Sequence, residues 1–209
     1  MTRPSRVERH ALCDTAVELG PTAPTLCEPW DVASLLAHLH LREARPDLAV
    51  GVVVPLLGDR TAAGQAQIAA WPFETLVAAV RSGPPVWSPA RFGPVDEAMN
   101  LGEMFIHHED IRRANGMDPR PAYEQALVDG LATMLRRTAG LTFHRSPVGV
   151  ALRWPGHRDV VAKKPTARGA VTLVAPVPEL VLYASGRERV ARVEIDGPDD
   201  AVAAFTASR

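Results

Sequence analysis

Hydrophobic residues recur at helical spacing through the first two thirds of the chain. Within segments separated by glycine and proline, apolar side chains fall three or four residues apart, the pattern of amphipathic helices. This pattern predicts six helices, over residues 5–19, 31–44, 61–70, 73–81, 101–114 and 123–139. Asp31 and Asp96 are expected as the N-caps of the second and fifth helices, and Gly140 as the end of the sixth. We expect residues 47–57 to form a short helix or an irregular connector.

The hydrophobic period changes near residue 140. Beyond it, apolar and β-branched residues alternate in short runs that are typical of strands. We expect strands over residues 148–154, 157–161, 170–174 and 190–195, and helices over residues 178–185 and 199–207. The first two strands flank a Pro-Gly turn and are expected to pair as a hairpin. The sequence therefore predicts an α+β protein, with a helical domain over residues 1–140 and a small α+β domain over residues 141–209.

Composition narrows the classes of protein that the sequence fits. Hydrophobic residues make up 46% of the 209 residues, and 23 basic against 24 acidic residues give a formal charge of −1. The lack of a basic excess argues against nucleic acid as a partner. No run approaches the roughly 20 apolar residues that cross a bilayer, and the N-terminus lacks the apolar core of a secretory signal. We therefore predict a cytoplasmic protein without membrane segments.

The chain has two cysteines, Cys13 and Cys27, which are too few for a disulfide framework and do not form a Cys-x-x-Cys pair. In a reducing compartment, each is expected to serve as a buried small apolar side chain. A thiol nucleophile would need histidine and asparagine partners that the sequence does not indicate.

Candidate chemistry lies on the helix predicted over residues 101–114. Glu103 and His107 are four residues apart, so their side chains stand on one helix face and can share a divalent metal. His38 is a third candidate, because it lies beside the apolar stripe of the helix over residues 31–44. Histidine with carboxylate suits Zn²⁺ first, with Fe, Ni or Mn as alternatives. The structural alternatives are an exposed Glu103–His107 ion pair and a packed core histidine.

Two neighbours of His107 have expected roles of their own. Asp110, three residues on, is expected either to orient the site or to bind substrate, with an exposed helix carboxylate as the alternative. His108 is rotated by about 100° from His107 around the helix axis, so we expect it in a packing or surface role. His40 lies two residues after His38 on the helix over residues 31–44. It therefore points roughly the other way and is the less favoured ligand.

Three blocks of sequence, in this order, resemble the mycothiol-dependent maleylpyruvate isomerase family, part of the wider DinB-like metalloprotein group. The blocks are Trp30-Asp31-Val32 with Leu36-Ala37-His38-Leu39, then Gly102-Glu103 with Ile106-His107-His108-Glu109-Asp110-Ile111-Arg112-Arg113-Ala114, then Pro178-Glu179-Leu180 with Ser185-Gly186-Arg187. Within that group, they are similar to those of actinobacterial proteins known only as metal-binding. The resemblance covers nearly the whole chain.

The resemblance implies an N-terminal DinB-like four-helix bundle and a small α+β C-terminal domain. It implies a divalent metal held by His38, Glu103 and His107, mycothiol as a thiol cofactor, and Arg187 as a residue that assists the substrate. The expected function is that of a metal- and mycothiol-dependent transferase or isomerase acting on an electrophilic small molecule. The alternative is a non-enzymatic metal-binding or ligand-carrier protein, because a fold does not fix the activity of its site.

Overall fold

The computed structural model describes residues 3–49 and 58–209, which belong to two compact units. The first unit spans Met1–Ala122 and the second Tyr123–Arg209. The sequence pattern predicted the boundary at residue 140. Helix α7 (Gln125–Thr142) therefore belongs to the second unit in the structure, whereas the prediction placed it in the first domain. Each unit encloses its own set of buried apolar residues.

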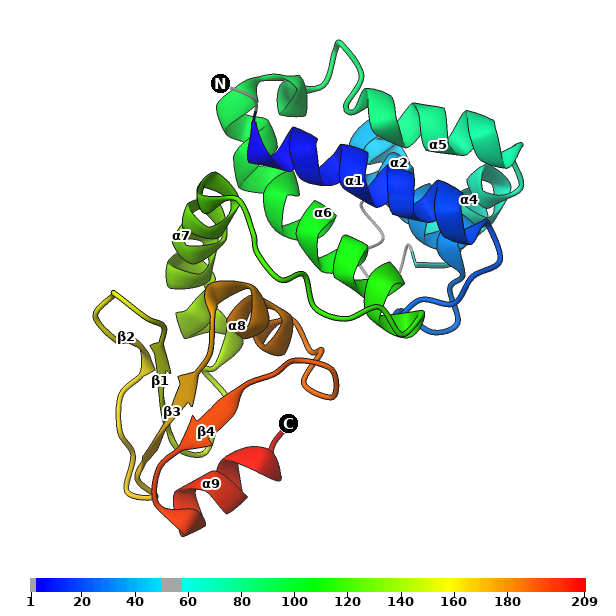
Figure 1. Cartoon of the computed structure of the whole chain (residues 1–209). Helices are drawn as coiled ribbons and strands as arrows, with labels where there is room; N and C mark the ends of the chain where they lie inside the picture. The colour runs from blue at the N-terminus through cyan, green and yellow to red at the C-terminus, as the bar shows by residue number, and fades with distance from the viewer. Residues whose placement is uncertain (1–2, 50–57) are drawn as a thin grey trace. The chain divides into compact units, whose positions relative to one another are not determined.

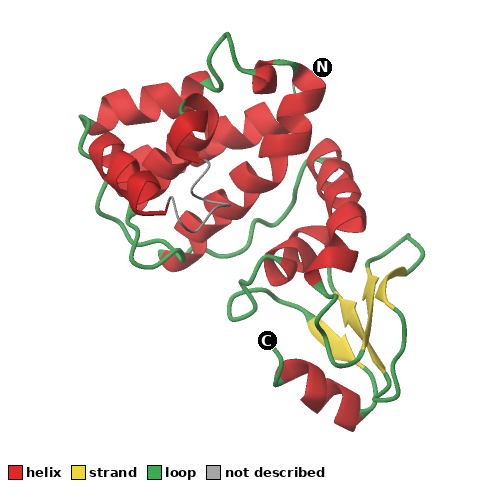
Figure 2. Cartoon of the chain, turned by 180° about the vertical axis from the view of Figure 1, so that it is seen from behind, coloured by secondary structure: helices red, strands yellow, loops and turns green. Residues whose placement is uncertain are grey.

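Helices make up the first unit. Figure 2 shows only helices and loops in the part of this unit that is described, and no helix within residues 3–49 or 58–209 is long and apolar enough to cross a membrane. The elements are α1 (Pro4–Leu19), α2 (Val32–Ala44), α3 (Pro46–Ala49), α4 (Gly58–Ala69), α5 (Phe73–Ser82), the short 3₁₀ helix η3 (Pro89–Arg91) and α6 (Gly93–Ala114). They confirm the first five helices predicted from the hydrophobic period. The predicted connector begins as α3, and its residues 50–57 lie outside the described chain.

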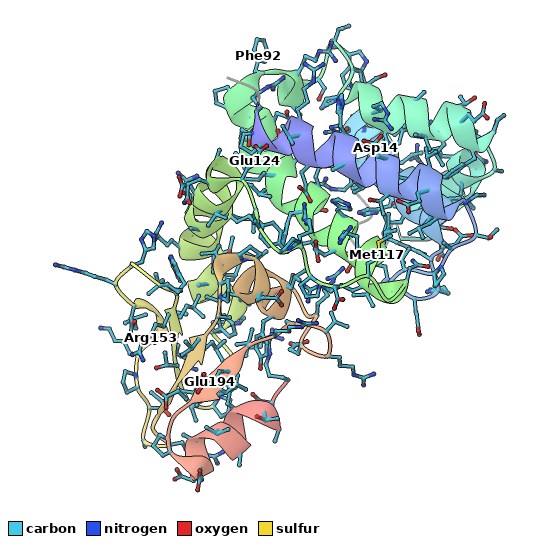
Figure 3. The ribbon with its side chains drawn as sticks, in the orientation of Figure 1. Asp14, Phe92, Met117, Glu124, Arg153 and Glu194 are labelled. Carbon is cyan, nitrogen blue, oxygen red and sulfur yellow. The ribbon has the colours of Figure 1, made fainter. Side chains whose placement is uncertain are left out.

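The two predicted N-caps have different outcomes. Asp31 caps α2 by accepting a hydrogen bond from Ser34 N at 2.9 Å, as expected. The prediction for Asp96 was wrong, because α6 begins earlier and its N-cap is Phe92, an exposed residue that projects from the surface (Figure 3). Pro94 suits the first turn, where a helix has no use for the missing N–H. The Asp96 carboxylate lies inside the first turn and pairs with side chains of other segments.

The core of the first unit forms where the helices meet. Helix α1 packs along α6, and α2 packs against α4 and α5 (Figure 1). Large side chains that are almost completely buried in this core are Leu12, Leu35, Leu36, Leu39, Leu41, Leu76, Met104 and Ile111. Burial of this apolar surface is the main stabilising contribution to the unit. The apolar stripe predicted for α2 faces the core, which places His38 at the edge of the core.

Helix α6, like α1, carries polar side chains on its buried face. Those of α6 with less than a tenth of their surface exposed are Asp96, Asn100, His107, His108, Glu109 and Asp110. Buried charges require ionic or hydrogen-bonding partners. Glu109, for example, accepts hydrogen bonds from Arg113 Nε and Arg120 Nε, each at 2.9 Å. The position of α6 is therefore specified by charge pairing as well as by apolar packing.

The second unit is a mixed four-stranded sheet with three helices, α7, α8 (Val177–Ala184) and α9 (Asp199–Thr206). The strands are β1 (Gly149–Arg153), β2 (Val160–Lys163), β3 (Ala170–Val174) and β4 (Glu194–Asp196), in the order β2-β1-β3-β4. Strand β1 pairs antiparallel with β2, as the predicted hairpin requires, and parallel with β3, which pairs antiparallel with β4. The elements together confirm the α+β class.

Three elements in the second unit have boundaries that differ from the prediction by three residues or more. Strand β2 begins at Val160, whereas the strand was predicted over residues 157–161. Helix α7 continues through Gly140 to Thr142, because a helix interior tolerates glycine at a modest energetic cost. Strand β4 begins later than the strand predicted over residues 190–195. There the backbone N–H of Ala191 bonds to Arg187 O at 3.0 Å in a turn, so this segment does not pair as a strand.

Gly149→Ala is expected to lower the free energy of unfolding of the second unit by about 1–3 kcal/mol, the cost of overpacking. A Cβ atom at Gly149 would lie 2.6 Å from Pro165 Cα and 2.9 Å from Ala170 Cβ, so the strand would have to move. Gly140→Ala is the matched control, because a Cβ there meets only Ala162 O, at 3.8 Å. Alanine in a helix is favoured over glycine by about 0.5–1 kcal/mol. Chemical denaturation measures the free energy of unfolding of both variants. If both substitutions changed it in the same direction, the packing argument would be contradicted.

Candidate metal centre

Side chains from α2 and α6 converge in the first unit. His38, Glu103 and His107 each offer one ligand atom, and these atoms all lie within 4.8 Å of one another. Glu103 and His107 stand one turn apart on α6, with His107 Nε2 3.5 Å from Glu103 Oε2. His38 comes from α2, and its ring lies 5.4 Å from the His107 ring, edge to face. The structure therefore brings together the three residues that the sequence suggested as ligands.

Packing holds His38 in a form that can bind a metal. Its ring lies 5.0 Å from the ring of Trp30, and the residue is buried. Burial, followed by the charge of His107, lowers the pKa of His38 to about 4. The imidazole is therefore neutral at pH 7, and a nitrogen lone pair is available for coordination.

His107 is oriented by groups on the side of its ring opposite Glu103. Its Nδ1–H donates to Asp110 Oδ2 at 2.9 Å, and Cys27 Sγ donates to the same oxygen at 3.1 Å. Burial alone would lower the pKa of His107, but hydrogen bonds, above all the one to Asp110, outweigh burial and raise the pKa to about 10. Because Asp110 holds Nδ1, Nε2 is the nitrogen that faces the cluster.

Glu103 supplies the negative charge of the cluster. Its side chain is 37% exposed, so it also lies nearest to solvent. Burial would raise the pKa of Glu103, but the hydrogen bond from His107 and the charge of Arg42 outweigh burial and lower the pKa to about 2. Arg42 Nε lies 3.6 Å from Glu103 Oε2. The carboxylate is therefore ionised at neutral pH.

The adjacent histidine, His108, takes part in a different set of contacts. Its Nδ1–H donates to Glu8 Oε1 at 2.8 Å, and its Nε2 lies 2.9 Å from Thr15 Oγ1, both residues being on α1. Arg120 Nη2 donates to the same Glu8 oxygen at 2.7 Å. Burial alone would raise the pKa of Glu8, but the hydrogen bonds from His108 and Arg120 outweigh it and lower the pKa. His108 thus links α6 to α1, in agreement with the packing role expected for it.

The donor set fits a first-row divalent metal. Zn²⁺ takes imidazole nitrogens and carboxylate oxygens at about 2.0–2.2 Å, which places tetrahedral ligands about 3.4 Å apart. The three donors, now separated by no more than 4.8 Å, reach that spacing by modest side-chain rotation. A cation would take the place of the proton that His107 carries on Nε2. Two neutral imidazoles and one carboxylate would leave a divalent ion with one uncompensated positive charge.

A second group of metal-ligand residue types shares His107. Cys27, His107 and Asp110 also offer ligand atoms within 4.8 Å of one another. In this group the thiol and the His107 Nδ1–H already bond to the Asp110 carboxylate. These internal bonds suit a group that holds His107 in place better than one that takes an ion itself.

Sequence reasoning missed two residues of the site. Arg42 carried a usable signal, because it follows His38 by four residues and therefore shares its helix face. Cys27 carried no such signal, because only the tertiary fold brings its loop to α6. The role expected for Cys27, a small apolar side chain, was wrong, since its thiol bonds to Asp110. Cys13 does fit that role: it is fully buried, and burial raises its pKa to about 11.

Arg187, the other residue expected in the site, lies in the second unit directly after α8. Its Nη1 donates to Ser185 O at 2.6 Å, and its backbone N–H bonds to Leu182 O at 3.0 Å. Between them Gly186 has a φ of +85°, the left-handed conformation that commonly ends a helix. The substrate role expected for Arg187 stays a prediction.

Comparison with known proteins shows a distant structural relationship. The chain matches no known family profile and no curated protein sequence. Among solved structures, its fold is similar to one described as the crystal structure of the mycothiol-dependent maleylpyruvate isomerase, with a TM-score of 0.59 and 14% sequence identity. The match covers 94% of this chain and 92% of that chain. At this level of identity the similarity shows the fold alone, which is the α+β architecture described above.

Proposed function

We propose that this protein is a metal-dependent transferase or isomerase that acts on an electrophilic small molecule. The reaction uses a low-molecular-weight thiol, mycothiol or a similar compound. The convergence of His38, Glu103 and His107 within 4.8 Å is the observation that carries the proposal. The fold shared with an enzyme described as mycothiol-dependent supports the choice of thiol. Zn²⁺ is the first choice of metal, and a DinB-like four-helix bundle is the proposed architecture of the helical unit.

The donor set suits catalysis better than a purely structural site. Three protein ligands leave a tetrahedral metal one position for substrate or cofactor, as in catalytic zinc centres. When bound, the metal would supply the Lewis acidity that lowers the pKa of a coordinated thiol. His38 and His107 would contribute neutral nitrogens and Glu103 a single negative charge. This leaves the centre positive overall and so favours an anionic sulfur.

Asp110 is proposed as a positioning residue. It is 0% exposed, and its carboxylate bonds to His107 Nδ1, so orientation of the site is the role that its surroundings support. Contact with substrate, the other role left open by the sequence, would require an exposed carboxylate. Arg187 is proposed to assist the electrophilic substrate through its guanidinium, as the family resemblance implies.

Metal content tests the ligand set. Protein loaded with Zn²⁺ is expected to retain it stoichiometrically after removal of excess ion, whereas His38→Ala, Glu103→Ala and His107→Ala are each expected to lose it. His40→Ala and Glu74→Ala are matched controls that should keep the ion. His40 lies on the same helix as His38, but its ring lies 5.3 Å from a tryptophan ring at a tilted angle, and Glu74 is exposed on α5. Stoichiometric metal in all three ligand variants would refute the site.

Calorimetric titration of thiols separates the enzyme from the alternative, a non-enzymatic metal-binding or ligand-carrier protein. Mycothiol added to the metal-loaded protein is expected to give saturable heat, whereas β-mercaptoethanol at the same concentrations is not. The heat should be absent in the His107→Ala variant, because the metal is then lost. Equal responses to the two thiols, or no response to either, would favour the carrier protein.

A further inference from the structure

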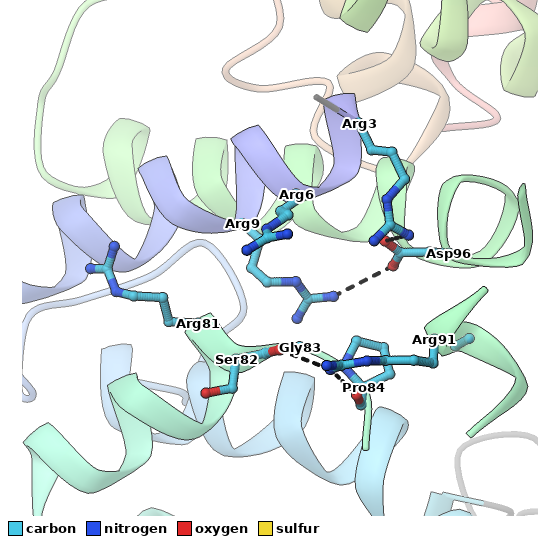
Figure 4. Close-up of a pocket in the computed structure, with 10 residues that line it drawn as sticks. Arg3, Arg6, Arg9, Arg81, Ser82, Gly83, Pro84, Arg91 and Asp96 are labelled. Carbon is cyan, nitrogen blue, oxygen red and sulfur yellow. Dashed lines mark hydrogen bonds and ion pairs between the residues drawn. The ribbon is translucent and has the colours of Figure 1, made fainter. Parts of the chain in front are cut away.

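A cavity of about 120 Å³ opens in the first unit, and none of the candidate metal ligands lines it. Residues at and just before the start of α1, at the end of α5 and the turn after it, and in the segment leading into the first turn of α6 form its walls (Figure 4). Of the ten described residues that line it, one is acidic, Asp96, and five are arginines: Arg3, Arg6, Arg9, Arg81 and Arg91. A cavity of roughly this size can hold a group as large as a benzene ring.

Three of these arginines are matched by carboxylates. Arg9 is buried and donates to both carboxylate oxygens of Glu43. Arg3 Nη1 lies 3.1 Å from Asp96 Oδ2, and Arg81 pairs at 2.7 Å with an exposed aspartate on α1. These pairs shape the walls of the cavity without adding net charge.

The charges of Arg6 and Arg91 are not matched in this way. Within the described part of the chain, no carboxylate forms an ion pair with either guanidinium; Arg91 Nη1 donates instead to the uncharged carbonyl of Pro84 at 2.9 Å (Figure 4). Arginines of this region also act on a nearby histidine. Partial burial first, then the charges of Arg81 and Arg6, lower the pKa of His10. Two guanidinium charges thus remain without a counter-charge at one cavity.

We propose that this cavity binds a phosphoryl group. Guanidinium forks match the geometry of carboxylate and phosphate oxygens. A carboxylate offers two coplanar oxygens that suit a single fork, whereas a phosphoryl group offers three oxygens in a tetrahedral arrangement. Arg6 reaches the cavity from α1 and Arg91 from η3, so the cations lie on different walls, which suits the tetrahedral group. Its charge of about −2 at neutral pH also balances the two unmatched guanidinium charges.

The phosphoryl site is distinct from the metal-ligand cluster, although α6 contributes to both. Asp96 lies at the cavity and His107 in the cluster, separated by roughly 16 Å along the helix axis at 1.5 Å per residue. Occupancy of one site can therefore be measured while the other is monitored. The phosphoryl site does not depend on the thiol chemistry proposed above.

Titration of inorganic phosphate into the full-length protein tests the site. Backbone amide NMR shifts are followed at an ionic strength held constant with sodium chloride, so that general screening does not contribute. Saturable shifts of residues around the cavity are expected with inorganic phosphate and with phenyl phosphate. Tighter binding of phenyl phosphate would indicate that the site takes phosphate esters, and tighter binding of inorganic phosphate that it takes the free ion.

Arginine variants tie the binding to the cavity. Arg6→Gln is expected to weaken phosphate binding about tenfold, the effect of losing one charge-assisted contact. Arg6 is exposed, so the fold should be retained. Arg60→Gln removes an exposed arginine of α4 that does not line the cavity, and it is expected to bind phosphate as the unmodified protein does.

Three results would overturn the proposal: equal affinity in Arg6→Gln and the unmodified protein, an equal loss in Arg60→Gln, or saturation by succinate but not by phosphate. The Zn²⁺ content of Arg6→Gln is measured in parallel and is expected to be unchanged. That measurement distinguishes failure of the phosphoryl site from failure of the metal centre.

Discussion

Replacing Arg9 with methionine will lower the free energy of unfolding by about 3–5 kcal/mol, because it leaves a buried carboxylate without its counter-ion. The side chains of Arg9 and Glu43 are only 2% and 5% exposed, and Arg9 Nη1 lies 2.8 Å from Glu43 Oε2. Burial raises the pKa of Glu43 above 4.5 even beside the guanidinium. Arg9 counteracts this rise, so the pKa of Glu43 will be higher still in the variant. A raised carboxyl pKa in the folded state costs stability as the pH rises, so the loss in the variant will be larger at pH 8 than at pH 5.

Urea denaturation followed by tryptophan fluorescence measures this loss, since three of the four tryptophans lie in the first unit. The matched control is the double variant Arg9→Met with Glu43→Leu, which replaces the ion pair by apolar side chains. It should recover most of the lost stability, because well-packed apolar residues commonly replace a buried pair at little cost. A loss below about 1 kcal/mol in Arg9→Met would mean that water reaches the carboxylate and relieves it.

Asp110→Asn is expected to weaken Zn²⁺ binding about 10- to 100-fold, the usual effect of removing the group that orients a metal-binding histidine. The substitution keeps the shape of the side chain but removes the charge that holds His107 Nδ1 at 2.9 Å. It also removes the anionic acceptor of the Cys27 thiol. Zn²⁺ affinity is measured by competition with a chromophoric chelator.

Asp14→Asn is the control for this measurement. Its side chain is 70% exposed on α1 and pairs only with Arg81 among the described residues, so the metal affinity should not change. Far-UV circular dichroism of both variants separates a loss of affinity from a loss of fold. An unchanged Zn²⁺ affinity in a folded Asp110→Asn variant would show that the carboxylate does not support the ligand set.

The helices that sequence predicted well are those with one apolar face and a clear terminator. Helix α5 has both: its buried residues Leu76, Val77 and Val80 lie at helical spacing, and Gly83 follows its last residue. The start of helix α6 could not be predicted in the same way. Its first two turns bury Asp96 and Asn100, which bond to each other and to side chains of segments distant in sequence. A polar residue that is buried through tertiary pairing has no signature in a hydrophobic pattern.

The candidate site was predictable only in part, for a related reason. Helical spacing was sufficient to place Glu103 beside His107, because both lie on one helix. It placed His38 beside an apolar stripe, but only the packing of separate helices brings that residue to the other two. The contact of Cys27 with Asp110 joins a loop to a helix, and no local pattern predicts it. The metal itself stays a prediction.

The buried polar side chains of α6 limit how the three donors His38, Glu103 and His107 can be transplanted to another scaffold. A designer who copies only the three donors would leave behind Asp110, which fixes the ring of His107. A designer who copies the whole helix would bring Arg113 along with Glu109 but would leave behind its second partner, Arg120, which lies in the loop after α6. The smallest portable unit is therefore α6 together with the part of α2 that carries His38 and the residues paired with α6 on α1 and in the loop after α6, moved as one block.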